Sequence, residues 1–131
     1  MTTSDQDAAN RATFGTLIDE FGAGWTACDP RRMASVFAED ATFVPDPFQK
    51  AIVGREAIAA YWDTLPYEQS DVAFRFGEIY VRGPWFATEF KCTFRRRRTG
   101  DPVDVRGALF CETREGRITE MRMHWDRRTG A

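Results

Sequence analysis

The chain has few residues with which to build a metal site or a disulfide framework. It contains three cysteines, Cys28, Cys92 and Cys111, and a single histidine, His124. The cysteines are odd in number and widely spaced, and no Cys-x-x-Cys pair occurs, which argues against structural zinc and against disulfides. Reduced thiols are typical of the cytoplasm, so we expect a cytoplasmic protein that binds no metal.

Long apolar runs and a dominant charge are also missing. No run approaches the ~20 apolar residues that cross a bilayer, and Met1–Asn10 is polar, so we expect no membrane partner and no signal peptide. The 18 Lys and Arg residues are offset by 20 Asp and Glu residues. This balance gives no field that attracts nucleic acid. The basic run Arg95–Arg98 lacks interleaved aromatics, and we interpret it as a solvated hairpin tip or a dimer rim.

Motifs for common cofactors and nucleophiles are absent as well. No glycine-rich phosphate loop, Ser-His-Asp set or nucleophilic cysteine constellation is visible, and we expect no cofactor. Aromatic residues, in contrast, make up 14% of the chain, and its length of 131 residues predicts one domain over 1–131. Such an aromatic core can line a cavity as well as fill one.

Helices are predicted in the first half of the chain. Apolar residues recur at helical spacing over about 10–27, whereas residues 1–8 are expected to be frayed. Asp29 and Pro30 fit the N-cap and the first position of a second, short helix that ends near Ala38.

A short strand over 41–45 precedes a third predicted helix over about 55–64, which Pro66 should end. The hydrophobic period then changes to two, which predicts long hairpin strands, including about 103–113 and 118–126. Helices followed by alternating strands indicate an α+β fold.

The phase of the strand alternation shifts at Gly77 and Glu78, where we predict a β-bulge. Parity with Trp125 puts His124 on the opposite, outer face of the last strand, and a bulge near Thr119 and Glu120 would reverse this assignment. The pattern leaves open which face Arg75, Glu89 and Arg106 occupy.

One carboxylate, Asp46, stands among the apolar residues of segment 43–48. Apolar surroundings can raise the pKa of a carboxyl group and let it shuttle protons. The alternative is structural, since Asp-Pro sequences commonly begin turns.

The segments Asp40–Thr42, Asp46–Phe48 and Gly54–Tyr61, together with the order of elements, resemble the nuclear-transport-factor-2-like superfamily. Within it the chain looks like the ketosteroid isomerase and SnoaL-like polyketide cyclase branch. The resemblance implies a cone-shaped α+β roll, in which three N-terminal helices pack in the concavity of a curved, bulged, mainly antiparallel sheet. It further implies a deep apolar pocket for a small apolar molecule and a homodimer formed through the outer sheet face.

The resemblance also implies roles for individual residues. Asp46 falls where the isomerases keep the base that moves a proton from one carbon to another beside a carbonyl. Trp125 falls on a pocket tryptophan of the last strand, and Tyr61 on an aromatic residue of the third helix that faces the ligand. The remaining residues expected to contact substrate are Phe21, Trp25, Gly107, Leu109 and Met123.

Two positions depart from the isomerase pattern. Phe21 stands where those enzymes place an oxyanion-donating tyrosine, and Gly107 stands at about the position of their protonated aspartate. Loss of one such donor typically costs ~10²–10³ in turnover. Tyr61, a trapped water or an inward arginine would have to replace them, although Tyr61 could equally be a core aromatic.

Two hypotheses follow. In the first, the chain is a cofactor-free isomerase or cyclase that abstracts a proton beside a carbonyl with Asp46 as general base. In the second, it is a non-catalytic ligand-binding or dimerisation module of the same fold. Other chemistry on this fold, such as epoxide hydrolysis or dehydration, would need a second inward carboxylate that the sequence does not place.

Overall fold

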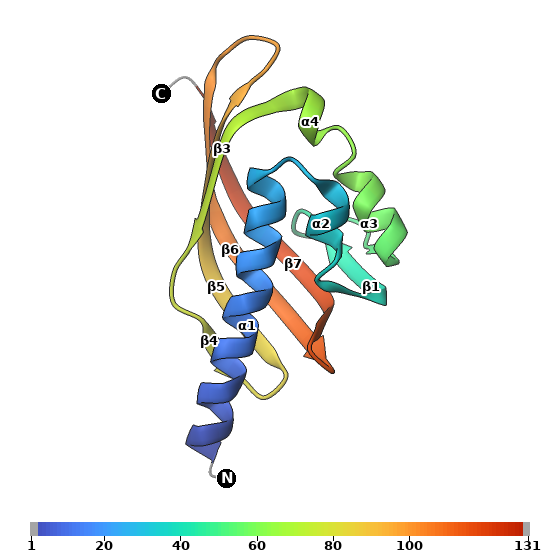
Figure 1. The fold of residues 1–131 in the computed structure, drawn as a ribbon, viewed down its shortest axis with the longest axis vertical. Coiled ribbons are helices and arrows are strands. Elements are labelled where there is room, and N and C mark those ends of the chain that lie inside the picture. Colours follow the sequence, from blue (N-terminus) through green and yellow to red (C-terminus); the bar gives the residue numbers. More distant parts are fainter. Residues whose placement is uncertain (1–2, 130–131) are drawn as a thin grey trace.

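A long helix lies across one face of a curved sheet, and shorter helices flank one edge of that sheet (Figure 1). The structure is a computed structural model that describes residues 3–129. Its elements are α1 (Thr3–Thr26), α2 (Pro30–Ala34), β1 (Phe37–Val44), β2 (Ile52–Val53), α3 (Arg55–Tyr61), α4 (Leu65–Glu68), β3 (Gln69–Phe76), β4 (Tyr80–Arg82), β5 (Trp85–Arg96), β6 (Pro102–Arg114) and β7 (Arg117–Thr129).

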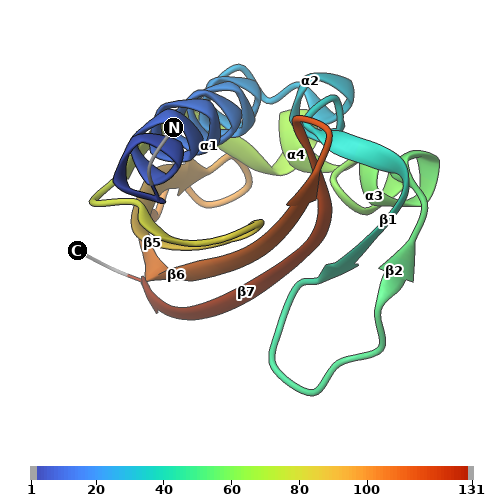
Figure 2. The same ribbon diagram turned by 90° about the horizontal axis from the view of Figure 1, so that it is seen from below.

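The sheet is mixed and mainly antiparallel. Its strand order is β2-β1-β7-β6-β5-β3, and β4 pairs with β5 beyond the end of β3. The pairing of β1 with β7 is parallel, and the other pairings are antiparallel. The sheet curves around α1 without closing on itself (Figure 2). The predicted α+β class and the mainly antiparallel sheet are therefore confirmed.

The two faces of the sheet follow the predicted alternation. On β5, Phe86, Phe90 and Cys92 are buried against the helices, while Trp85 and Glu89 are exposed on the outer face. The same parity continues across β6 and β7 through their register. Burial of this apolar inner face against α1 supplies the main driving force for folding.

The predicted bulge lies between β3 and β4. Phe76 pairs with Phe90, and Tyr80 pairs with Ala87, so the three residues 77–79 face only two on β5. The extra residue bends the sheet edge at this point.

The first helix starts earlier than expected. Its predicted apolar stripe is buried at Phe14, Ile18 and Trp25. The helix begins at Thr3, so the frayed segment predicted over 1–8 is wrong for the residues from Thr3 onward, and residues 1–2 lie outside the described part. The apolar stripe of α1 packs against the sheet, and this contact stabilises the helix, because tertiary packing contributes most of a helix's stability.

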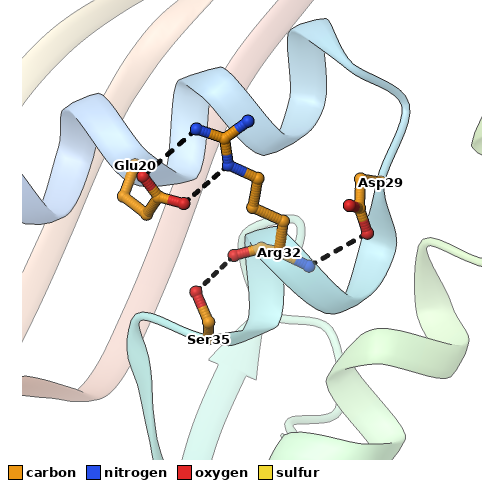
Figure 3. Close-up of polar contacts among 4 residues, drawn as sticks. All are labelled: Glu20, Asp29, Arg32 and Ser35. Atoms are coloured by element: carbon orange, nitrogen blue, oxygen red, sulfur yellow. Dashed lines mark hydrogen bonds and ion pairs between the residues drawn. The ribbon is translucent and has the colours of Figure 1, made fainter.

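Capping fixes the short helix α2 against α1. The Asp29 side chain accepts a hydrogen bond from the Arg32 backbone N–H at 3.1 Å, as predicted for an N-cap. Arg32 Nε donates to Glu20 Oε1 on α1 at 2.6 Å, and Ser35 Oγ donates to the Arg32 carbonyl at 2.6 Å. Figure 3 shows these contacts. They set the angle at which the chain enters β1.

The ends of the second and third predicted helices differ from the sequence prediction. The second helix does not reach Ala38, because strand β1 already begins at Phe37. The third ends at Tyr61, and Pro66 lies in the first turn of the separate helix α4, where a missing N–H costs nothing. A block of three N-terminal helices filling the concavity is not confirmed, since α1 alone lies across the sheet, α2 packs against α1 and α3, and α3 packs against β1 (Figure 2).

Close approach of β6 to β7 requires a glycine at position 107. A Cβ there would overlap the His124 carbonyl oxygen and the Trp125 backbone.

We predict that Gly107→Ala lowers the free energy of unfolding by about 1–3 kcal/mol through overpacking, measured by urea denaturation. Gly15→Ala is the matched control, because nothing lies within 4 Å of its added methyl group. At that half-buried helix position, Gly15→Ala should instead raise the free energy of unfolding by about 0.5–1 kcal/mol. Equal effects of the two substitutions would contradict the packing argument.

Candidate functional site

An apolar cleft lies where the end of β7 meets α3 and the end of α1. Its volume is about 140 Å³. It is lined by Trp25, Pro45, Tyr61, Trp62, Gln69, Phe94, Val105, Met123, Trp125 and Arg127. Most of these side chains are apolar, and few polar groups converge among them, which is typical of small-molecule sites.

Indole hydrogen bonds hold two walls of the cleft. Trp125 Nε1 on β7 donates to the Pro45 carbonyl at 2.6 Å, which ties the loop after β1 to the last strand. Trp25 Nε1 on α1 donates to Gln69 Oε1 at 2.9 Å. At the mouth, the Arg127 guanidinium carbon lies 5.9 Å from the centre of the Trp125 ring, within cation–π range.

Asp46 lies at the edge of this cleft, next to Pro45. Its side chain is half-buried and is not among the lining residues. Its backbone carbonyl accepts a hydrogen bond from the Gln49 N–H at 3.1 Å, which closes a turn. Phe48 within this turn is fully exposed and has φ 64°, a conformation that non-glycine residues rarely adopt. The structural interpretation of Asp46, that it begins a turn, therefore holds for its backbone.

The Asp46 carboxylate acts electrostatically on Tyr61. Burial is the larger cause that raises the pKa of the Tyr61 hydroxyl, and the negative charge of Asp46 raises it further. Tyr61 is therefore a neutral phenol at physiological pH and can donate a hydrogen bond. The Asp46 carboxylate is therefore near enough to act on the hydroxyl of a cleft residue.

Trp62 lines the cleft, and its indole N–H lacks a hydrogen-bond acceptor among the described residues. Its side chain is 8% exposed, and its Nε1 is buried with no acceptor among residues 3–129. The ring packs edge-on against Phe21 and Tyr61 and at a tilt against Trp25 and Phe43.

The structure brings together part of the predicted site. Trp25, Tyr61, Met123 and Trp125 line the cleft, and Asp46 lies at its edge. Phe21, Gly107 and Leu109 do not line it. Phe21 is fully buried among other aromatic rings, Leu109 is fully buried between Thr88 and Met123, and Gly107 carries no side chain.

The cleft is smaller than the deep pocket that the resemblance implies. Phe21 makes edge-on contacts with Trp25, Trp62 and Phe74, and Phe74 stacks on Phe90. These rings occupy the interior of the cone. The space that remains matches a single six-membered ring, because a cavity of about 150 Å³ holds benzene.

A larger concavity, of about 1140 Å³, lies on the outer face of the sheet. The sequence left open which face of the sheet four residues occupy. They lie on the outer face, because they line this concavity: Arg75, Glu89, Arg106 and His124. It is an open, strongly charged groove that shares no lining residue with the cleft. We therefore take the cleft as the candidate site, despite its smaller size.

Sequence reasoning missed several residues of the cleft. Phe94, Val105 and Arg127 share the face of Trp125, and strand parity together with the hairpin register could have found them. Gln69 carried no signal, because its position depends on the bond from Trp25. Trp62 lies within the helix predicted over about 55–64, and helical spacing cannot show that its N–H lacks a partner.

The profile of the SnoaL-like domain matches residues 18–121, which is most of the chain. The chain belongs to the SnoaL-like family. Among curated proteins, none matches it by sequence. The family assignment agrees with the nuclear-transport-factor-2-like fold and the ketosteroid-isomerase-like branch expected from the sequence.

Solved structures share this SnoaL-like fold at low sequence identity. A putative isomerase from Bacillus subtilis is 24% identical, with a TM-score of 0.78 over 88% of this chain and 87% of that one. A putative scytalone dehydratase from Novosphingobium aromaticivorans is 12% identical, with a TM-score of 0.81 over 97% and 90%. The epoxide hydrolase/cyclase-like enzyme SalBIII, which takes part in pyran ring formation in the polyether salinomycin, is 20% identical, with a TM-score of 0.75 over 92% and 94%.

The remaining titratable groups of the SnoaL-like domain offer no metal site. Within residues 3–129, His, Cys, Asp and Glu form no group of three that could hold a metal ion. Cys92 and Cys111 are buried packing thiols, and burial raises the pKa of Cys92 to about 12. None of the helices in this part of the chain is long and apolar enough to cross a membrane.

The interaction between Asp46 and Tyr61 predicts a change in titration. In Asp46→Asn the pKa of Tyr61 should fall, because the repulsion that disfavours tyrosinate is removed, yet it should stay above 10.0 because burial is the larger cause. Tyrosinate absorbance against pH measures this, with Tyr61→Phe identifying the signal. An unchanged Tyr61 titration in Asp46→Asn would show that the two groups do not interact.

Proposed function

We propose that this SnoaL-like chain binds a small ring carbonyl compound in the cleft and transfers a proton beside the carbonyl, with Asp46 as general base. The observations that support the proposal are a ring-sized apolar cleft lined by Tyr61 and the electrostatic influence of the Asp46 carboxylate on the Tyr61 hydroxyl. The names of the structural neighbours, which include an isomerase, a dehydratase and a cyclase-like enzyme, support carbonyl or ring chemistry.

The proposed step is an ordinary enolisation. The Asp46 carboxylate takes the proton from the carbon next to the carbonyl, and the electron pair of that C–H bond forms an enolate. The Tyr61 hydroxyl donates to the developing oxyanion. In a ligand with a neighbouring C=C bond, return of the proton from Asp46 to the far carbon of that bond gives isomerisation. Attack of the enolate on a second carbonyl of the ligand breaks the π bond of that carbonyl and gives cyclisation, and the proton on Asp46 passes to the new alkoxide. A four-ring steroid is far larger than the cleft, so we infer a one-ring substrate or one ring of a larger chain.

Deuterium exchange tests this step without knowledge of the natural substrate. Wild-type protein in D₂O should speed the loss of the α-proton NMR signals of cyclohexanone above the buffer rate. Asp46→Asn should lower the exchange rate by about 10²-fold or more, within the range for a lost general base. Asp63→Asn is the matched control, because Asp63 is exposed and outside the cleft, and its rate should equal that of the wild type. Equal rates for Asp46→Asn and the wild type would exclude Asp46 as the base.

A second candidate function is a dimerisation module, and exposed aromatics on the outer sheet face favour it. Trp85 and Phe110 are 42% and 43% exposed, and Phe110 packs edge-on against His124.

We propose that this face pairs with a second copy of the chain. Light scattering should then give a dimer mass for the wild type and a monomer mass for Phe110→Glu, which replaces an exposed aromatic ring with a charge. A monomeric wild type would refute this assembly.

A further inference from the structure

The cleft has a charged group at its mouth that the proposed proton transfer does not use. Arg127 lines the cleft near the end of β7 and is exposed to solvent. We propose that its guanidinium binds a carboxylate carried by the ligand, so that the ring enters the cleft and the carboxylate stays at the mouth. This inference rests on the proposed function, because it names the substrate class of the same site as one-ring carbonyl compounds that bear a carboxylate.

Arg127 has no acidic partner among residues 3–129. On the neighbouring strand, Arg106 pairs with Asp104 at 2.9 Å. Arg127 instead lies opposite Val105 in the register of β6 with β7, and no ion pair of the described part of the chain includes it. A guanidinium in the lining of a cleft that has no carboxylate of its own can bind one that the ligand supplies.

The ring of Trp125 positions this guanidinium. The guanidinium carbon of Arg127 lies 5.9 Å from the ring centre, and Trp125 is itself held by the 2.6 Å bond from its Nε1 to the Pro45 carbonyl. A guanidinium that already lies over an aromatic ring loses less side-chain freedom when a ligand binds. Its planar fork offers two parallel N–H bonds and one positive charge, which the two oxygens and single negative charge of a carboxylate match.

Neighbouring polar groups add donors and positive charge to this part of the cleft. Gln69 Oε1 accepts from Trp25 Nε1, which leaves the amide hydrogens of Gln69 as donors. The Cys28 Sγ donates to the Gln69 carbonyl at 3.6 Å. Burial is the larger influence on the pKa of Cys28 and raises it, whereas the positive charge of Arg97 lowers it. A second guanidinium therefore acts on the region around Gln69, which favours an anionic ligand.

The negative charge of Asp46 decides how such a ligand is oriented. Asp46 acts on the Tyr61 hydroxyl and forms no ion pair with Arg127. Like charges repel, so the carboxylate of the ligand should lie away from Asp46 and the ketone should lie toward it. A six-membered ring with the two groups at opposite positions, 1 and 4, fulfils this condition.

Two probes of nearly equal shape isolate the effect of the charge. 4-Oxocyclohexane-1-carboxylate is ionised at neutral pH, and 4-oxocyclohexane-1-carboxamide is its uncharged counterpart. Isothermal titration calorimetry of the wild type should show that the carboxylate binds about 2–5-fold more tightly than the amide, the range for a charge pair exposed to water. Added salt should reduce this preference and leave the Kd of the amide unchanged, because salt screens exposed charges.

Substitution of neighbouring arginines assigns the preference to one side chain. Arg127→Gln should abolish the preference for the carboxylate, and the amide in the same variant reports any change in the cleft itself. Arg128→Gln is the matched control, because it removes the same charge from a residue that lines a hollow with Asp104 and Arg106 and not the cleft. A preference that is absent in the wild type, survives Arg127→Gln or falls equally in Arg128→Gln would overturn the proposal.

The outcomes separate this inference from the proposed base. A carboxylate preference that depends on Arg127, without α-proton exchange in the bound ketone, would exclude the role of Asp46 and support that of Arg127. Exchange that depends on Asp46, with no carboxylate preference, would exclude Arg127 alone. Failure of both probes to bind the wild-type chain would overturn both.

Discussion

The parallel pairing of β1 with β7 is the constraint on which the candidate site depends. Phe43 lies opposite Met121 and Val44 opposite Arg122, so the two strands leave this part of the sheet in the same direction. The loop after β1 therefore runs beside the end of β7, where Trp125 Nε1 bonds to the Pro45 carbonyl. This bond joins residues 80 positions apart in the sequence and places Asp46 at the edge of the cleft. An antiparallel β1 would carry the same loop to the opposite end of the sheet.

Aromatic packing sets what the cleft can hold. The fold leaves a curved inner face, and large rings occupy most of the space between that face and α1. Interiors pack at nearly crystalline density, so each added ring removes volume that a ligand would otherwise use. Relatives with the same fold can therefore bind different molecules while the helices and strands stay alike. In this chain the volume that remains is about 140 Å³, and Tyr61, Gln69 and Arg127 are among the polar residues that border it.

Much of the fold could be predicted from the sequence because its strands are half-buried and their side chains alternate. That alternation located β5, β6 and β7, the bulge after Phe76 and the outward position of His124. Helix ends were harder to predict, since Phe37 suits a helix face as well as a strand and only the pairing with Ile118 decides.

The candidate site was predictable only in part. Motif resemblance pointed to Asp46, Tyr61 and Trp125; Tyr61 and Trp125 line the cleft, and Asp46 follows the lining residue Pro45. Residue patterns could not show that Phe21 fills the space where a donor stands in the isomerases, nor that the Trp62 N–H lacks an acceptor. Both facts depend on how rings from separate elements pack in three dimensions.

The central claim is that ligands bind in the cleft between Tyr61 and Trp125 rather than in the larger groove on the outer face of the sheet. A crystal structure of the protein soaked with cyclohexanone tests it most directly. The account predicts electron density for the ring between Trp62 and Trp125, with one α-carbon facing the Asp46 carboxylate. Density confined to the outer groove beside Arg106 and His124 would contradict it.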